Sequence, residues 1–155
     1  MNSEIQAVRE FHEKVKVSTP QRLTDLFDIE VDNLIQGLSN QLLASSRSLE
    51  PMLKVFSHDR RVLRAHLMIE ELGELLEAMA NRNEVGALDA LTDLTYVVFG
   101  TAVTLDLPLD EAFQEVHRSN MTKQKMSNDP GKERIRDKGP NYVPADLDAI
   151  LRRHR

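Results

Sequence analysis

The sequence predicts an all-α fold, a bundle of four to five helices. Apolar residues recur at spacings of three and four along nearly the whole chain, as expected for amphipathic helices. Aromatic residues make up only 5% of the 155 residues, and the chain has just six Gly and six Pro. A β-sandwich or barrel would use more aromatic, β-branched and turn residues. We therefore expect a single helical domain over residues 1–155.

The first expected helix spans residues 3–16, where Ile5, Val8 and Phe11 share one face. The other expected helices cover residues 21–46, 60–81, 84–105, 109–126 and a short final turn at 145–153. The expected breaks are "STP" (18–20), "SSRSLEP" (45–51), "NRN" (81–83), "DLP" (106–108) and a basic, Pro- and Gly-containing loop at 127–146. In "STP" a hydroxyl residue would cap the next helix and Pro would lie in its first turn, while Ser57 and Asn83 are the N-caps expected for the third and fourth helices.

Composition argues against several classes of protein. The net charge of −5 is unsuited to binding a nucleic-acid backbone, and the absence of Cys excludes disulfides and cysteine metal sites. The longest uncharged apolar run, residues 94–105, is too short to cross a bilayer. The first residues lack the apolar stretch of a secretory signal. We expect a cytoplasmic protein that binds neither nucleic acid nor membrane.

Acidic residues gather in the third expected helix, in "MIEELGELLEAM" (68–79). Glu70, Glu71 and Glu74 fall within an arc of roughly 100° on a helical wheel, opposite the apolar stripe. A solvated acidic face gives the same pattern and is far commoner than a metal site. This helix alone therefore favours the solvated face.

The fourth expected helix changes that balance. Its segment "LTYVVFGTAVTL" (94–105) is uncharged on every side, which predicts burial all round at the centre of a bundle or at a subunit interface. The same helix carries Asp89 and Asp93 one turn apart, and a short link can bring them toward the three glutamates. Carboxylates that converge with few bases nearby (Arg64 and Arg82 are the closest in sequence) repel one another unless Mg²⁺ or Mn²⁺ lies among them. The two clusters together favour a metal site.

The available ligand types indicate the chemistry. The chain has no Glu-x-x-His pair, which a di-iron bundle would use. His66 lies four residues before Glu70 and is either a ligand or a packed, hydrogen-bonded histidine. Oxygen ligands suit Mg²⁺, which typically serves a phosphate substrate. Pyrophosphate or phosphoryl chemistry is therefore expected.

The fifth expected helix places Asn120 and Lys123 on its apolar face. Asn120 would read a base edge or a sugar hydroxyl, or would tie helices together. Lys123 would contact a phosphate or reach out to water. The basic tail would close over a triphosphate or form a solvated loop; its basic residues are Lys132, Arg134, Arg136 and Lys138.

Four blocks occur in order: "EELGELLEAM", "LDALTDLTYVVFGTA", "EVHRSNMTKQ" and "KGPNYVPADL". Together they resemble the all-α nucleoside triphosphate pyrophosphatases, the superfamily of MazG, phosphoribosyl-ATP pyrophosphohydrolase and the dimeric dUTPases and dCTPases. The chain is most similar to the small MazG-like, phosphoribosyl-ATP pyrophosphohydrolase-like branch. The resemblance covers residues 63 to about 147. Residues 18–56 fit less well, as an extra helical segment without an assigned function.

The resemblance implies hydrolysis between the α- and β-phosphates of a nucleotide, with Mg²⁺ (or Mn²⁺) as cofactor. Glu71 and Glu74 match the E-x-x-E motif that holds the metal. Asp93 matches the last position of the second motif, E-x-x-D, but Ala90 stands at its first position. Asp89 is the expected substitute.

Further roles follow from the same resemblance. Glu70 would be a metal ligand or the base that deprotonates the attacking water, so the expected catalytic pair is Glu70 and Glu71. The expected substrate-binding residues are Asn120, Lys123, Lys138 and Tyr142. Family members form dimers or tetramers, so a homo-oligomer is implied.

Three functions remain open from the sequence. The first is a pyrophosphohydrolase acting on a nucleoside triphosphate or deoxynucleoside triphosphate, with dUTP, dCTP or a modified nucleotide preferred, giving the monophosphate and pyrophosphate. The second is hydrolysis of phosphoribosyl-ATP on the same fold. The third is a non-catalytic helical oligomerisation or binding module.

Overall fold

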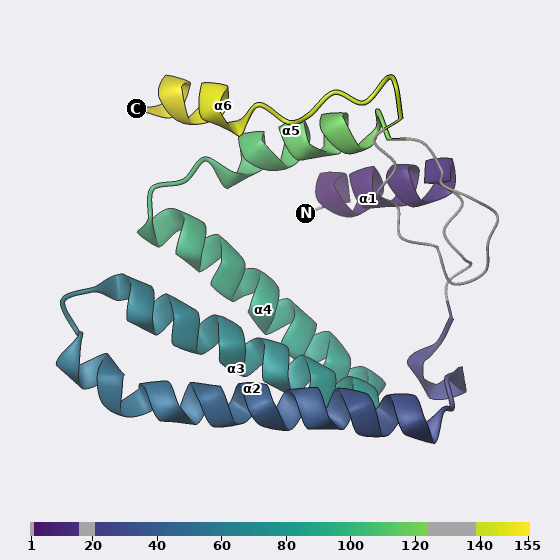
Figure 1. Ribbon diagram of the computed structural model, residues 1–155, viewed down its shortest axis with the longest axis vertical. Helices are drawn as coiled ribbons and strands as arrows, with labels where there is room; N and C mark the ends of the chain where they lie inside the picture. Colours follow the sequence, from purple (N-terminus) through teal and green to yellow (C-terminus); the bar gives the residue numbers. More distant parts are fainter. Residues whose placement is uncertain (1, 16–20, 124–138) are drawn as a thin grey trace. The chain divides into compact units, whose positions relative to one another are not determined.

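The computed structural model describes residues 2–15, 21–123 and 139–155 (Figure 1). All regular structure in these ranges is helical, which confirms the predicted all-α class. The chain divides into two compact units, residues 20–106 and residues 1–19 with 107–155.

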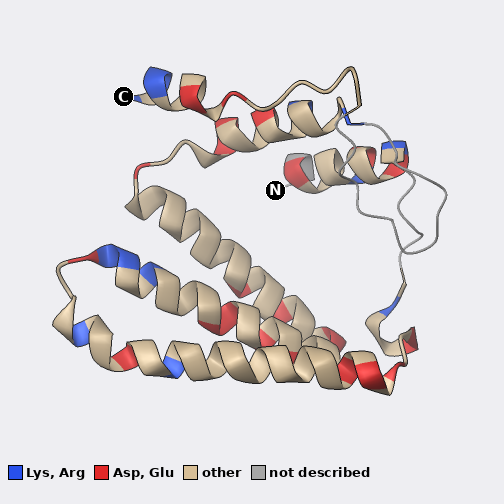
Figure 2. Cartoon of the chain, in the orientation of Figure 1, with Lys and Arg blue, Asp and Glu red and all other residues tan. Residues whose placement is uncertain are grey.

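The unit of residues 20–106 is built from three long helices. A short 3₁₀ helix, η1 (Leu23–Asp25), precedes α2 (Ile29–Val55), α3 (Arg60–Ala80) and α4 (Glu84–Thr104). The middle helix, α3, packs against both α2 and α4 (Figure 1). Short connections make successive helices antiparallel, so the acidic parts of α3 and α4 lie near each other (Figure 2).

Helix α2 differs from the helix expected at residues 21–46. It begins later, because Asp28 caps it by accepting from the backbone N–H groups of Glu30 and Val31 at 3.0 and 3.2 Å. It also continues through the serine-rich stretch and through Pro51 to Val55, so the break expected at residues 45–51 is wrong. Serine hydroxyls there donate back to carbonyls of the helix itself, as Ser45 does to Gln41 at 2.8 Å, and so do not disrupt it.

The next two helices have nearly the predicted bounds. The N-cap of α3 is Asp59, which accepts from the N–H of Arg61 at 2.9 Å, and the expected cap Ser57 lies outside the helix. The carboxylate of Asp59 also pairs with the Arg61 guanidinium, which lowers the pKa of Asp59 to about 2. Asn83 caps α4 as predicted, accepting from Gly86 N–H at 3.0 Å.

A small residue sets the contact between α2 and α3. The buried Ser39 hydroxyl of α2 donates to the backbone carbonyl of Gly73 in α3 at 2.8 Å. A Cβ atom added at Gly73 would lie 2.8 Å from Cδ2 of Leu43, closer than side chains pack. Glycine therefore lets the two backbones approach at this point.

Helix α4 is not buried all round within one chain, so the expected burial at the centre of a bundle is wrong for a single chain, while burial at a subunit interface stays a prediction. Val97 and Ala102 are buried, but Val85, Tyr96 and Val103 are 80%, 79% and 83% exposed. The reason is geometric, because α3 is the only helix of this unit that packs extensively on α4. The side of α4 that faces away from α3 is therefore exposed in the single chain.

The second unit contains α1 (Asn2–Val15), α5 (Leu109–Asn120) and α6 (Leu147–His154). Helix α5 contacts both of the others. It ends at Asn120, earlier than the expected residue 126, because the chain turns at Met121 and Thr122. Among the described helices none is by itself long and apolar enough to cross a membrane; α4 and α5 pass that test of length and composition only as a bent pair.

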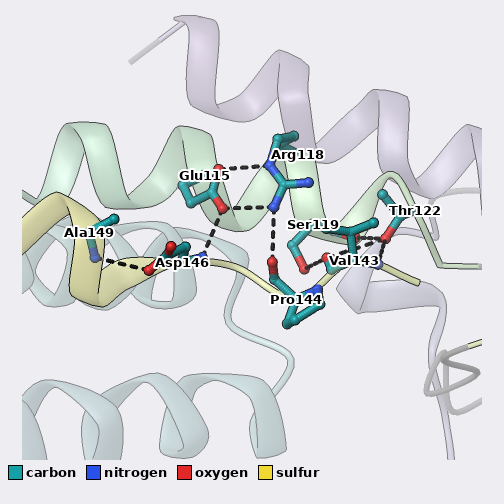
Figure 3. Close-up of polar contacts among 8 residues, drawn as sticks. All are labelled: Glu115, Arg118, Ser119, Thr122, Val143, Pro144, Asp146 and Ala149. Carbon is teal, nitrogen blue, oxygen red and sulfur yellow. Dashed lines mark hydrogen bonds and ion pairs between the residues drawn. The ribbon is translucent and has the colours of Figure 1, made fainter. Parts of the chain in front are cut away.

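Hydrogen bonds hold residues 143–146 against α5 (Figure 3). Ser119 donates to the carbonyl of Val143 at 2.9 Å, and Arg118 donates to the carbonyl of Pro144 at 2.9 Å. The Glu115 carboxylate pairs with Arg118 and accepts from Asp146 N–H at 2.8 Å. These two donors lower the pKa of Glu115 to about 2. The "KGPNYVPADL" block thus has a defined position on α5 from residue 143 onward.

Candidate active site

A pocket of about 460 Å³ lies in the unit of residues 20–106, between the second half of α2, the second half of α3 and the start of α4. Its acidic lining comes from Glu70, Glu74 and Glu77 of α3 and Asp89 of α4. The remaining lining residues are Leu43, Ser46, Arg47, Ala78, Asn81, Asn83, Gly86 and Ala90. Three of the five sequence-predicted carboxylates, Glu70, Glu74 and Asp89, therefore line one cavity, and both helices contribute to it.

Two of the clustered carboxylates, Glu71 and Glu74, have raised pKa values. Partial burial raises the pKa of Glu71, and repulsion from Glu74, Asp93, Glu70 and Asp89 raises it further. Burial likewise raises the pKa of Glu74, with added repulsion from Glu70, Glu77, Asp93 and Asp89. All five predicted metal ligands are thus within electrostatic range of one another, although Glu71 and Asp93 do not line the pocket itself.

Most of this cluster lacks a basic partner among the described residues. Glu71, Glu74, Asp89 and Asp93 have no ion pair with a basic side chain there, whereas Glu70 lies 3.6 Å from Nε2 of His66. In the same ranges, no three carboxylate or imidazole groups are arranged closely enough to hold a metal ion. Like charges without a counter-ion stay apart, so ligation requires the solvent-exposed Glu74, Asp89 and Asp93 to turn toward a common point. The all-oxygen donor set fits Mg²⁺ or Mn²⁺.

The two arginines named from the sequence are engaged elsewhere. Arg82 pairs with Asp32 of α2 and lies over the Phe27 ring, 4.5 Å from its centroid. Arg64 lies against α4, where a Cβ atom added at Gly100 would be 2.8 Å from its Nη1. Neither belongs to the lining of the pocket.

Sequence analysis missed the pocket's own cation, Arg47 of α2. It is solvent-exposed and, within the described residues, has no ion pair with the acids. The expected helix end at residue 46 placed Arg47 in a loop, so its position beside the glutamates was not foreseen. The apolar spacing on α2 continues from Leu42 to Leu49, and this signal could have predicted a helix that extends past residue 46 and includes Arg47.

His66 is a buried, hydrogen-bonded histidine, which was one of its two predicted roles. Its side chain is 6% exposed, and its Nδ1 lies 2.9 Å from the Ser46 hydroxyl. Its Nε2 lies 3.6 Å from a carboxylate oxygen of Glu70. Ser46, which is 2% exposed, is a second residue that sequence analysis did not single out.

The predicted nucleotide-binding residues belong to the other unit. Asn120 is the last residue of α5, Lys123 lies beyond its end, and both are half-buried. Tyr142 is half-buried at a turn closed by its N–H and the carbonyl of Gly139, 2.9 Å apart. Lys138, with Lys132, Arg134 and Arg136, lies outside the described residues.

The described chain is helical, and carboxylates of two antiparallel helices surround one pocket. This arrangement is typical of the MazG-like all-α pyrophosphatases. The profile of one family in that superfamily, phosphoribosyl-ATP pyrophosphohydrolase, matches residues 41–120, and the chain belongs to this family. Membership makes the protein a pyrophosphohydrolase, which acts on phosphoric anhydride bonds. No curated protein and no solved structure matches the chain.

The match also assigns the second half of α2 to the family region. The resemblance noted from sequence motifs began only at residue 63. Ser46 and Arg47 therefore lie within the matched part, together with the acids of α3 and α4.

Proposed function

We propose that the protein is a Mg²⁺-dependent nucleoside triphosphate pyrophosphohydrolase that yields a nucleoside monophosphate and pyrophosphate. One observation carries the proposal: carboxylates from α3 and α4 surround one pocket, and among the described residues Glu74 and Asp89 of its lining have no ion pair with a basic side chain. Such a cluster is costly without a cation. A cation held there would in turn attract the charged phosphates of a nucleotide.

Glu71, Glu74, Asp89 and Asp93 are the residues that would hold the metal. When bound, Mg²⁺ supplies charge neutralisation for the phosphates and a lower pKa for a coordinated water. Mn²⁺ accepts the same oxygen ligands and would substitute for it.

The chain's own residues would supply the remaining chemistry. Glu70 lies in the pocket lining and accepts the proton of the attacking water. Arg47, on the α2 side of the same pocket, contacts a phosphate oxygen and stabilises the charge of the departing pyrophosphate. Asn120, Lys123, Lys138 and Tyr142 are the proposed contacts to the nucleotide.

Two substrate classes fit this chemistry. The first is a pyrimidine deoxynucleotide such as dUTP or dCTP, or a modified nucleotide. The second is phosphoribosyl-ATP, which is favoured by the family whose profile matches residues 41–120. Both carry the α–β phosphoric anhydride bond, so the reaction is the same and only the group beside the α-phosphate differs.

The test is pyrophosphate release from a panel of canonical and modified nucleotides together with phosphoribosyl-ATP, in Mg²⁺, in Mn²⁺ and in EDTA. Metal-dependent release of pyrophosphate and monophosphate from one compound supports the proposal and names the substrate. Silence across the whole panel, with no rise in melting temperature on adding Mg²⁺, would favour a non-catalytic helical module instead.

The site assignment has its own test. Glu74→Ala and Asp93→Ala are each expected to abolish turnover while circular dichroism and the melting transition show a folded protein. Glu50→Ala is the matched control, because Glu50 is an exposed carboxylate of α2 outside the pocket lining. Turnover retained in both site variants would contradict the assignment.

A further inference from the structure

A chain of polar contacts through two buried residues leads from α2 to one carboxylate of the pocket. The Ser46 hydroxyl lies 2.9 Å from Nδ1 of His66, and Nε2 of His66 lies 3.6 Å from Oε2 of Glu70. Ser46 and His66 are 2% and 6% exposed, whereas the Glu70 side chain is 36% exposed. The chain thus runs from a buried hydroxyl of α2 to a partly exposed carboxylate of α3, and both end residues line the pocket.

The hydrogen-bonding capacity of the three groups gives the chain a direction. Nδ1 of His66 lies 2.9 Å from the Ser46 hydroxyl, which can donate or accept, and 3.2 Å from the Ser46 carbonyl, which can only accept. If the hydroxyl donates to Nδ1, the neutral imidazole carries its proton on Nε2, facing Glu70. The opposite tautomer would satisfy the carbonyl but would present a lone pair to the Glu70 carboxylate, so the negative charge of Glu70 favours the proton on Nε2. The 3.6 Å separation is longer than an ordinary hydrogen bond, so the contact is a charge–dipole interaction that a small rotation of Glu70 would tighten.

The three glutamates of α3 that the sequence predicts for the site, Glu70, Glu71 and Glu74, differ in this respect. Glu71 and Glu74 have no protein donor within the described ranges. Glu70 alone has a buried donor directed at it. A carboxylate whose orientation is fixed by the protein is suited to proton transfer, where geometry decides the rate.

We propose that Ser46 and His66 are positioning residues, which hold the Glu70 carboxylate in the orientation that receives a proton from the attacking water. The inference rests on the proposed function, since it assigns Glu70 the role of base. It adds a reason for the length of α2: the helix must continue past residue 45 to place Ser46 beneath His66.

Two substitutions of His66 separate positioning from packing. In His66→Gln the amide nitrogen reaches the place of Nε2 and can donate to Glu70. In His66→Asn the shorter side chain keeps a polar group near Ser46 but does not reach the carboxylate. We expect kcat to fall about tenfold or more in the Asn variant and to recover in the Gln variant, with KM changed less than about twofold in both.

A serine pair provides the matched control. Ser46→Ala removes the donor to Nδ1 and is expected to lower kcat, whereas Ser45→Ala, one residue earlier on the exposed side of α2, is expected to have no effect. Equal kcat in wild type and His66→Asn would overturn the proposal. So would an equal loss in the Asn and Gln variants when both are folded, or a loss that disappears at saturating Mn²⁺, which would make Glu70 a metal ligand.

A measurement without turnover keeps this inference distinct from the proposed function. Long-range ¹H–¹⁵N spectra of the metal-free protein should show His66 with its proton on Nε2. That proton should exchange faster with solvent in Glu70→Ala, and the tautomer should shift in Ser46→Ala. An unprotonated Nε2 in the wild type would overturn the positioning role even if the enzyme hydrolyses nucleotides. The expected spectra together with a silent substrate panel would indicate instead that the proposed function has failed.

Discussion

At the scale of single residues, Glu71 and Glu74 lower the unfolding free energy of the metal-free protein. Burial and the charges of neighbouring carboxylates disfavour their ionised forms, and no basic side chain within the described ranges compensates. The folded state therefore binds a proton more tightly at these residues than the unfolded chain does. The metal-free protein is destabilised by its own site, and a bound cation would relieve that cost.

A neutral substitution should expose this cost. We expect Glu71→Gln to raise the melting temperature of the metal-free protein at neutral pH by a few degrees while turnover is lost. The reason is that glutamine keeps the size of the side chain and removes the repelled charge. Thermal unfolding in EDTA and the pyrophosphate assay measure the two effects, and Glu50→Gln, a change outside the pocket, should alter neither.

The pH dependence has a definite sign. Because the folded pKa of Glu71 is raised above its ordinary value, the unfolding free energy of wild type falls as pH rises from that value through the raised one. The advantage of Glu71→Gln should thus be absent at about pH 4 and fully present at about pH 7. An advantage that is the same at both pH values, or a variant less stable than wild type at neutral pH, would contradict the assigned cause.

Two glycines test the packing of whole helices. An alanine at Gly73 would place its Cβ 2.8 Å from Cδ2 and 2.9 Å from Cγ of Leu43, where α2 meets α3. At Gly37, on the exposed face of α2, a Cβ meets nothing within 4 Å. We expect Gly73→Ala to destabilise the protein by about 1–3 kcal/mol. Gly37→Ala should stabilise it by about 0.5–1 kcal/mol, because alanine favours the helix.

Urea unfolding of the two variants beside wild type measures both changes. Each variant adds one methyl group to a helix, so the intrinsic helix propensity changes equally and only the surroundings differ. A Gly73→Ala protein as stable as Gly37→Ala would mean that α2 and α3 do not approach as closely as the structure shows.

Helix ends that are set by local sequence signals could be predicted from the sequence, whereas ends that depend on other parts of the chain could not. Helices α3 and α4 were predicted nearly to the residue, because apolar spacing and the cap at Asn83 are local signals. The start and end of α2 were not, since Asp28 was overlooked as a cap and the serines at 45–48 were taken for a break. In that stretch the hydroxyls of Ser45 and Ser48 donate to carbonyls of the same helix, and Ser46 contacts His66, 20 residues away in the chain, which no local pattern shows.

The residues of the site likewise divide into those that local sequence patterns predict and those whose position depends on helix packing. The acids of α3 and α4 were identified from spacing alone, because residues three and four apart share a helix face. Ser46 and Arg47 were missed because their approach to the acids depends on how α2 lies along α3. The Ser39 hydrogen bond to Gly73 fixes that register, and no pattern within either helix encodes it.

At the scale of the whole molecule, the described residues bury few large apolar side chains within one chain. The buried apolar residues among them are mostly alanines, such as Ala78, Ala90 and Ala102. Large side chains of α4 instead remain exposed in a stripe along one helix face, formed by Val85, Tyr96, Phe99 and Val103. A continuous exposed apolar stripe of this kind is typical of an interface.

We expect this stripe to pack against a second copy of the chain, giving a dimer or a larger homo-oligomer. Val103→Glu should weaken association at least about tenfold, because a symmetric interface would bury the new charge twice. Val55→Glu is the control, since Val55 is an exposed valine at the end of α2 and outside the stripe. Light scattering after gel filtration measures the mass of all three proteins. A monomeric wild type would contradict the expectation directly. An unchanged oligomer in Val103→Glu would show that the chains associate through another surface and that the apolar stripe of α4 does not contact a second copy of the chain.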